Sequence, residues 1–79
     1  MFSEQKLRDT VAQAFPGAQV SVRDTTGTSD HFELVVVSDV FAGRSLIERH
    51  RMIYAVLGDA VGGPIHALSI RAETPSESR

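Results

Sequence analysis

The stretch "HFELVVVSDVFAGRSLIERHRMIY", residues 31–54, changes its periodicity halfway, and this change restricts the possible folds more than any other feature. Its first part, residues 31–38, is a mostly apolar run that predicts a strand. Its second part contains Ser45 and Glu48 at the spacing of the capping box that begins a helix. A third segment, 65–73, again reads as a strand. The chain therefore predicts a strand–helix–strand unit whose strands lie parallel in one sheet, joined by a right-handed connection.

The residues before this unit predict one more helix and one more strand. Residues 4–15 carry an apolar stripe at helical spacing, and Ser3 is a suitable N-cap. That stripe is expected to consist of Leu7, Val11 and Ala14. Residues 18–24 alternate between apolar and polar side chains and predict a strand that pairs with 31–38 as a hairpin. The order helix, strand, strand, helix, strand predicts an α+β sandwich, with a three-stranded mixed sheet and both helices on one face.

The second helix is expected to extend from Ser45 to the glycines and proline at 62–64, which would end it. Six apolar side chains are expected to form its buried face: Leu46, Ile47, Ile53, Tyr54, Leu57 and Val61. His50 follows Leu46 by four residues, so it is expected on the inner stripe with a packing or hydrogen-bonding role.

The composition limits the architecture and the chemistry of this chain. Its 79 residues suffice for one domain at 1–75, followed by a polar, flexible tail at 76–79. With no cysteine, it has neither a disulfide nor a thiolate ligand for a metal, and a reducing, cytoplasmic location is expected. The formal net charge of −2 argues against a strongly basic nucleic-acid binder. Neither a membrane span nor a signal peptide is expected.

Two of the three histidines fall at the starts of the two strands predicted to be parallel, His31 in one and His66 in the other. Because parallel strands start at the same edge of a sheet, both imidazoles are expected there, within reach of one ligand. Whether they converge stays open, since His66 shares the face of Leu68 whereas His31 shares the opposite face with Glu33. A structural role is the alternative: a half-buried core residue for His66 and an exposed loop-edge residue for His31.

The sequence contains no recognisable catalytic motif: no nucleophile with a histidine and a carboxylate at known spacing, no HExxH, no P-loop and no GxGxxG. No enzymatic activity is therefore expected. The remaining charged feature is a cationic cluster of Arg44, which directly precedes the second helix, and Arg49 and Arg51 within it. This cluster is either a solvated helix face or a site for phosphate or a partner's carboxylates, both of which guanidinium groups bind in a bidentate manner.

A set of residues in fixed order also resembles a known family. The pattern V-S-x-x-F-x-G, then R-H-R, then a histidine–alanine pair occurs here as Val37, Ser38, Phe41, Gly43, Arg49, His50, Arg51, His66 and Ala67. In these residues the chain resembles the BolA-like family, over nearly all of its length up to Pro75. Its short "TTGTSDHF" loop resembles the compact bacterial and plant-type members. The resemblance implies a fold like the type II KH domain.

The resemblance further implies a partner and a cofactor. BolA-like proteins form a heterodimer with a monothiol glutaredoxin, and this heterodimer holds a [2Fe–2S] cluster that glutathione helps to bind. The family's last-strand histidine, a cluster ligand, corresponds to His66. The second ligand comes from the loop before the second strand, where His31 is the candidate in this chain. The helix with Arg49, His50 and Arg51 is implied to lie near the partner interface, and Arg44 precedes it.

Two functions are therefore considered. The first is a non-enzymatic adaptor for iron–sulfur cluster trafficking or iron sensing, with a glutaredoxin partner. The alternative is a nucleic-acid-binding transcriptional regulator, which would use the KH-like fold and the helix with Arg44, Arg49 and Arg51. The negative net charge and the absence of the G-x-x-G loop that clamps nucleic acid in KH domains argue against this alternative.

Overall fold

The helices and strands follow one another in the predicted order. They are α1 (Glu4–Ala14), β1 (Gln19–Asp24), β2 (His31–Val37), the 3-10 helix η1 (Asp39–Phe41), α2 (Leu46–Leu57), the 3-10 helix η2 (Gly58–Ala60) and β3 (Ala67–Glu73). The computed structural model describes residues 3–27 and 30–78. Residues 1–2, 28–29 and 79, which belong to the predicted domain, its short loop and the predicted tail, lie outside the described part. No helix in the described part has the length and apolar character needed to cross a membrane.

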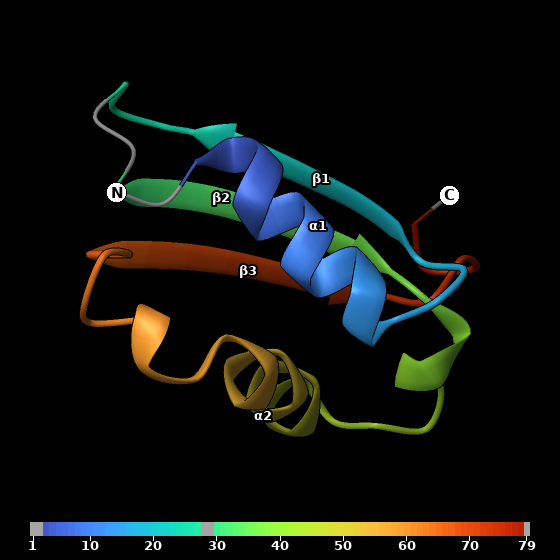
Figure 1. The fold of residues 1–79 in the computed structure, drawn as a ribbon. Helices are drawn as coiled ribbons and strands as arrows, with labels where there is room; N and C mark the ends of the chain where they lie inside the picture. The colour runs from blue at the N-terminus through green and yellow to red at the C-terminus, as the bar shows by residue number, and fades with distance from the viewer. Residues whose placement is uncertain (1–2, 28–29, 79) are drawn as a thin grey trace.

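The sheet has the order β1-β2-β3, with β1 antiparallel and β3 parallel to the central strand β2. Figure 1 shows α1 and α2 on the same side of this sheet. The α+β class, the mixed sheet and the placement of the helices are confirmed. Because β2 and β3 are neighbours, their first residues lie side by side, and His31 pairs in register with Ala67.

The core lies between the helices and one face of the sheet. Alternate residues of β2 are buried on that face, namely Phe32, Leu34 and Val36, while the residues between them are only partly buried. This period of two is the pattern expected for a strand with one covered face. Phe41 of η1 is fully buried, and its ring lies 5.7 Å from that of Phe15. Phe15 fills the place expected for Ala14, which is exposed.

Helix α2 begins as predicted and ends earlier than predicted. The Ser45 hydroxyl accepts a hydrogen bond from the Glu48 N–H, and the Glu48 carboxylate accepts one from the Ser45 N–H, which completes the capping box. The helix ends at Leu57, where Gly58 takes a φ of 55°, a conformation that favours glycine. The predicted end at residues 62–64 is wrong, because η2 follows at 58–60 and the chain then turns at 62–64 between the bridge partners Val61 and Ile65.

The buried stripe of α2 also differs from the prediction. Leu46, Ile47 and Tyr54, which were expected inside, are 67%, 65% and 42% exposed. The buried residues of the helix are Arg49, Ile53 and Leu57, at spacings of four. The helix is thus rotated so that an arginine, rather than leucine or isoleucine, occupies the first inner position. Because the spacing of apolar residues does not count an arginine as buried, it did not identify this face of α2 as the covered one.

Candidate metal centre

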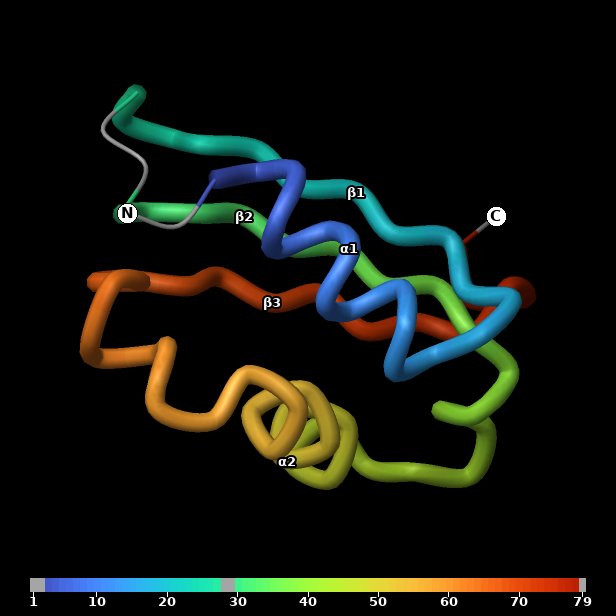
Figure 2. Tube along the Cα trace, in the orientation of Figure 1, coloured from blue at the N-terminus to red at the C-terminus, as the bar shows by residue number. Residues whose placement is uncertain are grey.

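His31 and His66 lie beside each other at one end of the sheet. His31 is the first residue of β2, and His66 directly precedes β3. The centroids of their imidazole rings are 5.1 Å apart, and the ring planes are inclined by 50°. In Figure 2 the beginnings of β2 and β3 run side by side at this end of the molecule. The structure therefore brings together the two histidines that sequence reasoning could place only at the same edge.

Backbone hydrogen bonds explain why the rings converge although alternation along the strands would separate them. His66 precedes the first residue of β3, so the alternation of side chains along that strand does not fix its direction. The N–H groups of His66 and Ala67 both donate to the carbonyl oxygen of Asp30, at 2.7 and 3.1 Å. Because Asp30 directly precedes His31, these bonds hold the two histidine-bearing segments together.

The surroundings of the two rings differ. His66 is exposed, and within residues 3–27 and 30–78 its ring makes no hydrogen bond. The alternative of a half-buried core histidine is therefore wrong for this residue. His31 is partly buried, and its Nδ1 lies 2.8 Å from Oδ1 of Asp30. Both imidazoles thus stand at the surface, where a partner molecule can reach them.

The two imidazoles do not form a complete metal site within this chain. Across the part of the chain that the structure describes, no group of three or more histidine, cysteine, aspartate or glutamate side chains is arranged to hold a metal ion. Metal centres in proteins commonly use four ligands, as in structural zinc sites and iron–sulfur clusters. Within residues 3–27 and 30–78, His31 and His66 therefore offer a pair of ligands, and a four-ligand centre built on this pair would need ligands from another molecule.

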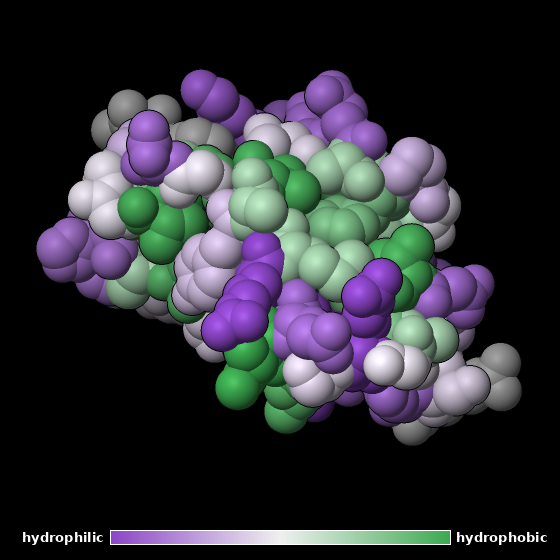
Figure 3. Space-filling view, turned by 90° about the horizontal axis from the view of Figure 1, so that it is seen from below, coloured by the Kyte–Doolittle hydropathy of each residue, from purple (hydrophilic) through white to green (hydrophobic). Residues whose placement is uncertain are grey.

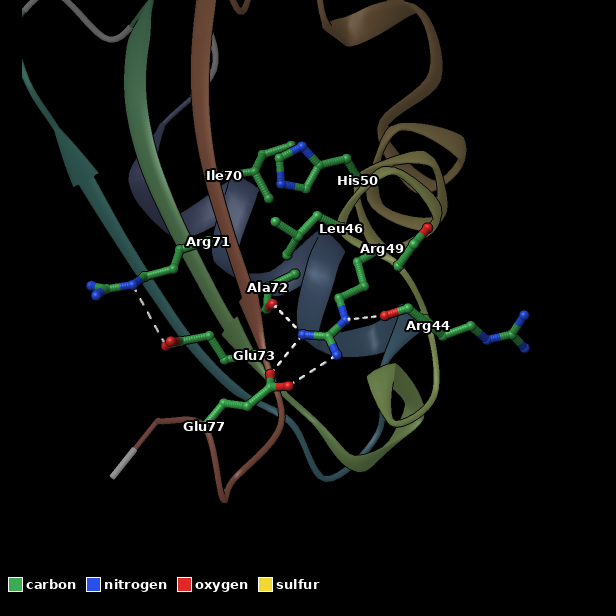
Figure 4. Close-up of a pocket in the computed structure, with 10 residues that line it drawn as sticks. Arg44, Leu46, Arg49, His50, Ile70, Arg71, Ala72, Glu73 and Glu77 are labelled. Atoms are coloured by element: carbon green, nitrogen blue, oxygen red, sulfur yellow. Dashed lines mark hydrogen bonds and ion pairs between the residues drawn. The ribbon is translucent and has the colours of Figure 1, made fainter.

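The arginine cluster is divided by the fold. Arg44 and Arg51 are exposed, whereas Arg49 is buried, so the expected continuous cationic face is not formed. Figure 4 shows that the Arg49 guanidinium points into the protein. It donates to both carboxylate oxygens of Glu77, at 2.6 and 3.1 Å, and to the carbonyl oxygens of Ala72 and Arg44, at 3.1 and 3.0 Å. A contact between Arg49 and another molecule would require this arrangement to open.

Glu77 was missed as an interacting residue because it lies in the segment 76–79 predicted as a flexible tail. Its carboxylate also accepts a hydrogen bond from the N–H of Thr74, and the Thr74 hydroxyl accepts one from the N–H of Glu77. The Thr74/Glu77 pair has the same reciprocal hydrogen bonds and spacing as the Ser45/Glu48 pair that identified the beginning of α2, so the sequence signal was present. The hydrogen bonds from Arg49, followed by that from Thr74, lower the pKa of Glu77 to about 2. The same pairing raises the pKa of Arg49.

A groove of about 640 Å³ lies between the first half of α2 and β3. Leu46, His50 and Ile70 line it, and in Figure 4 the side chains of the first two point toward Ile70. The inner position expected for His50 is thus a half-buried position on the wall of this groove. Arg44 also lines the groove, and its guanidinium lies 3.9 Å from the carboxylate of Glu48.

Comparison with known protein families shows to which family this chain belongs. The family model described as "BolA-like protein" matches residues 9–77. The chain belongs to the BolA-like family. This BolA-like chain is similar in structure to BolA1 from Arabidopsis thaliana, with a TM-score of 0.85 and 30% identity, covering 96% of this chain and 95% of that one. A bolA homologue from Coxiella burnetii has a TM-score of 0.81 and 32% identity, covering 99% and 97% of the two chains.

Curated BolA-like relatives come from several kinds of organism. Human BolA-like protein 1 is 47% identical over 53 residues, which cover 67% of this chain and 39% of the relative. The Escherichia coli "DNA-binding transcriptional regulator BolA" is 31% identical over 84 residues, covering 98% and 80%. The Arabidopsis "SufE-like protein 1, chloroplastic/mitochondrial" is 49% identical over 59 residues, covering 72% and 16%. This chain therefore spans less than two thirds of the length of human BolA-like protein 1 and of the Arabidopsis SufE-like protein.

Proposed function

We propose that this BolA-like chain is a non-enzymatic adaptor that pairs with a monothiol glutaredoxin and shares a [2Fe–2S] cluster with it. The observation that carries the proposal is the pair of exposed or partly exposed imidazoles, His31 and His66, with ring centroids 5.1 Å apart. An imidazole pair is the ligand set that replaces two thiolates in clusters of the Rieske type. The adaptor would act in cluster trafficking or iron sensing.

The ligand count explains why a partner is needed. A [2Fe–2S] cluster takes four protein or thiol ligands, and this chain has no cysteine to supply a thiolate. If His31 and His66 provide two ligands, a cysteine of the glutaredoxin and the thiol of glutathione complete the set. Both thiols have to stay reduced, which favours a cytoplasmic location. The cluster is cargo in this scheme, because ligands at the surface of the adaptor leave it accessible to a recipient protein.

The surface of α2 supports a partner on that side of the molecule. Leu46 and Ile47 are exposed large apolar residues at the beginning of the helix, and such residues are typical of protein contact sites when they form a patch. Figure 3, seen from the side on which α2 lies in Figure 1, shows apolar surface interrupted by strongly hydrophilic side chains. Arg44, His50 and Arg51 lie on this helix or just before it, so we assign the partner contact to them.

The distance between the two regions sets a requirement on the partner. His66 precedes β3, and Ile70, which faces His50 across the groove, lies four positions further along the chain. At about 3.3 Å per strand residue this corresponds to roughly 13 Å. A partner of domain size can span that distance, contacting the groove while it presents its own thiol ligand near His66.

The test is to mix the chain with a monothiol glutaredoxin, glutathione, iron and sulfide, and to record absorption and circular dichroism of the complex. A coloured heterodimer is expected, and His66→Ala and His31→Ala should each change its spectrum and lower the amount of bound cluster. His66→Cys should keep the cluster but shift its spectrum and lower its reduction potential, because a thiolate replaces an imidazole. The matched control is His50→Ala, which removes the only other histidine. It should change the affinity for the glutaredoxin without changing the spectrum.

An unchanged spectrum and cluster content in His66→Ala would remove His66 from the site and end the proposal. If only His31→Ala leaves the spectrum unchanged, the second ligand lies elsewhere and the adaptor function is retained with one histidine.

A second candidate function, DNA binding, is favoured by one observation, that the Escherichia coli relative is a DNA-binding transcriptional regulator. Arg51 on α2 and Arg44 just before it are exposed cations that would serve this function, since Arg49 is paired with Glu77. Two phosphate contacts would give a slope of about −1.8 for the logarithm of the binding constant against that of salt concentration. The double variant Arg44→Gln/Arg51→Gln should remove this slope. No binding of the unaltered chain at low salt rejects this function.

A further inference from the structure

Asp30 contacts both histidine-bearing segments through two different groups. Its side-chain Oδ1 lies 2.8 Å from Nδ1 of His31. Its backbone carbonyl oxygen accepts hydrogen bonds from the N–H groups of His66, at 2.7 Å, and Ala67, at 3.1 Å. One residue therefore orients the first imidazole and fixes the main chain that carries the second.

The side-chain contact determines which nitrogen of His31 carries the proton. An ionised carboxylate only accepts hydrogen bonds, so the Nδ1 that faces it has to be the N–H donor. In the neutral ring the lone pair is then on Nε2, at the opposite side of the imidazole from Asp30. Carboxylates that accept the second N–H of a metal-binding histidine fix its tautomer and increase its basicity as a ligand.

We propose that Asp30 is the positioning residue of the histidine pair: its carboxylate holds His31 as the Nδ1–H tautomer with Nε2 presented for ligation, and its carbonyl holds His66 beside it. This inference rests on the proposed function in one respect only, namely that the group bound by Nε2 of His31 is the cluster. The tautomer itself is a property of the chain without cluster or partner, so the two can fail separately.

A surface ion pair without this role is the competing explanation. The side chains of His31 and Asp30 are 36% and 41% exposed, and ion pairs at that exposure contribute little to stability. Stability measurements alone would therefore not separate the two explanations. The tautomer of His31 distinguishes the two explanations. A weak surface ion pair between Asp30 and His31 would not hold the ring in a single tautomer.

The experiment is long-range ¹H–¹⁵N NMR of the histidine rings in the chain without cluster, at about pH 8, where an ordinary imidazole is neutral. We expect His31 as Nδ1–H in the unaltered protein. Asp30→Ala should shift His31 toward the Nε2–H form that free imidazole side chains prefer. Asp30→Asn should do the same, because its amide NH2 group can donate to Nδ1. The matched control is Asp39→Ala, which removes an exposed carboxylate just beyond the other end of β2.

The role of the Asp30 carbonyl in holding the segment of His66 is tested separately, by hydrogen exchange of backbone N–H groups. The N–H groups of His66 and Ala67 should exchange slowly with solvent in all of these variants, because their acceptor is the main chain of residue 30. This also shows that Asp30→Ala is folded. Fast exchange of both N–H groups in the unaltered protein would overturn this role of the carbonyl.

In the complex with glutaredoxin, Asp30→Ala and Asp30→Asn should each bind the cluster about 10- to 100-fold less tightly than the unaltered protein. His31 found as Nε2–H in the unaltered chain, or as Nδ1–H in Asp30→Ala, would overturn the inference. If the tautomers behave as expected but the unaltered chain forms no cluster complex, the proposed function is rejected while the role of Asp30 in setting the tautomer stands.

Discussion

Replacing Arg49 with methionine should return the titration of Glu77 most of the way to that of an ordinary glutamate. The pKa of Glu77 is lowered from 4.5 to about 2, and the hydrogen bonds from Arg49 are the largest cause. The second cause, the N–H of Thr74, remains in the variant as long as the turn at 74–77 is kept. The titration midpoint should therefore rise from about 2 toward 4.5 while staying below it.

The midpoint is read from the ¹³C chemical shift of the Glu77 side-chain carboxyl as a function of pH. The control is Arg44→Met, which removes a guanidinium from the same end of α2 but leaves the Arg44 carbonyl that Arg49 binds. In this control Glu77 should still titrate near 2. The reasoning is refuted if Glu77 titrates near 4.5 in the unaltered protein, or if Arg49→Met leaves its midpoint near 2.

The same pair predicts how the stability of the fold depends on pH. Because the folded-state pKa of Glu77 is below its unfolded value, its stabilising contribution is fully present above about pH 4.5 and is lost as the pH falls toward 2. Urea denaturation between these pH values should show a loss of stability in the unaltered protein. This loss should be smaller in Arg49→Met, because Glu77 is then protonated at nearly the same pH in both states.

Three further predictions concern the fold and the partner surface. Phe41→Ala removes a fully buried ring and should lower the free energy of unfolding by about 3–5 kcal/mol in urea denaturation; a loss below 1 kcal/mol would contradict the central position given to η1. Ser45→Ala removes the N-cap of α2 and should cost about 1 kcal/mol by the same measurement. It should also raise the pKa of Glu48, which the bonds with Ser45 lower. Leu46→Ser should leave stability nearly unchanged, since this side chain is 67% exposed, but should weaken glutaredoxin binding in calorimetric titration. Equal affinity of Leu46→Ser and the unaltered chain would exclude Leu46 from the interface.

The interactions that sequence reasoning predicted correctly are mostly local. The Ser45–Glu48 capping box joins residues three positions apart, and the predicted alternation of residues 18–24 appears in β1 as exposed residues alternating with partly buried ones. Such patterns depend on the backbone conformation of the segment itself, so they can be recognised without knowing the rest of the fold. The order of these segments then left few possible topologies, because a helix between two strands favours a parallel pair.

The errors concern contacts between distant segments. Arg49 was placed in an exposed cluster because arginine is seldom buried, and its burial depends on acceptors 23 and 28 positions away, in Ala72 and Glu77. With Arg49 inside, Leu46 and Ile47 are turned outward, which apolar spacing alone did not indicate. The convergence of His31 and His66 likewise depends on the carbonyl of Asp30 accepting from the far strand.

The sequence by itself determined the elements, their order and the absence of any thiolate, since these depend on residue type and on spacings of a few positions. Only the tertiary structure decided which face of α2 is covered, that Glu77 pairs with Arg49, and that two imidazoles meet at the rim of the sheet. The physical reason is that burial and long-range hydrogen bonds are set by which surfaces are brought together. A short window of sequence contains only one of the two surfaces.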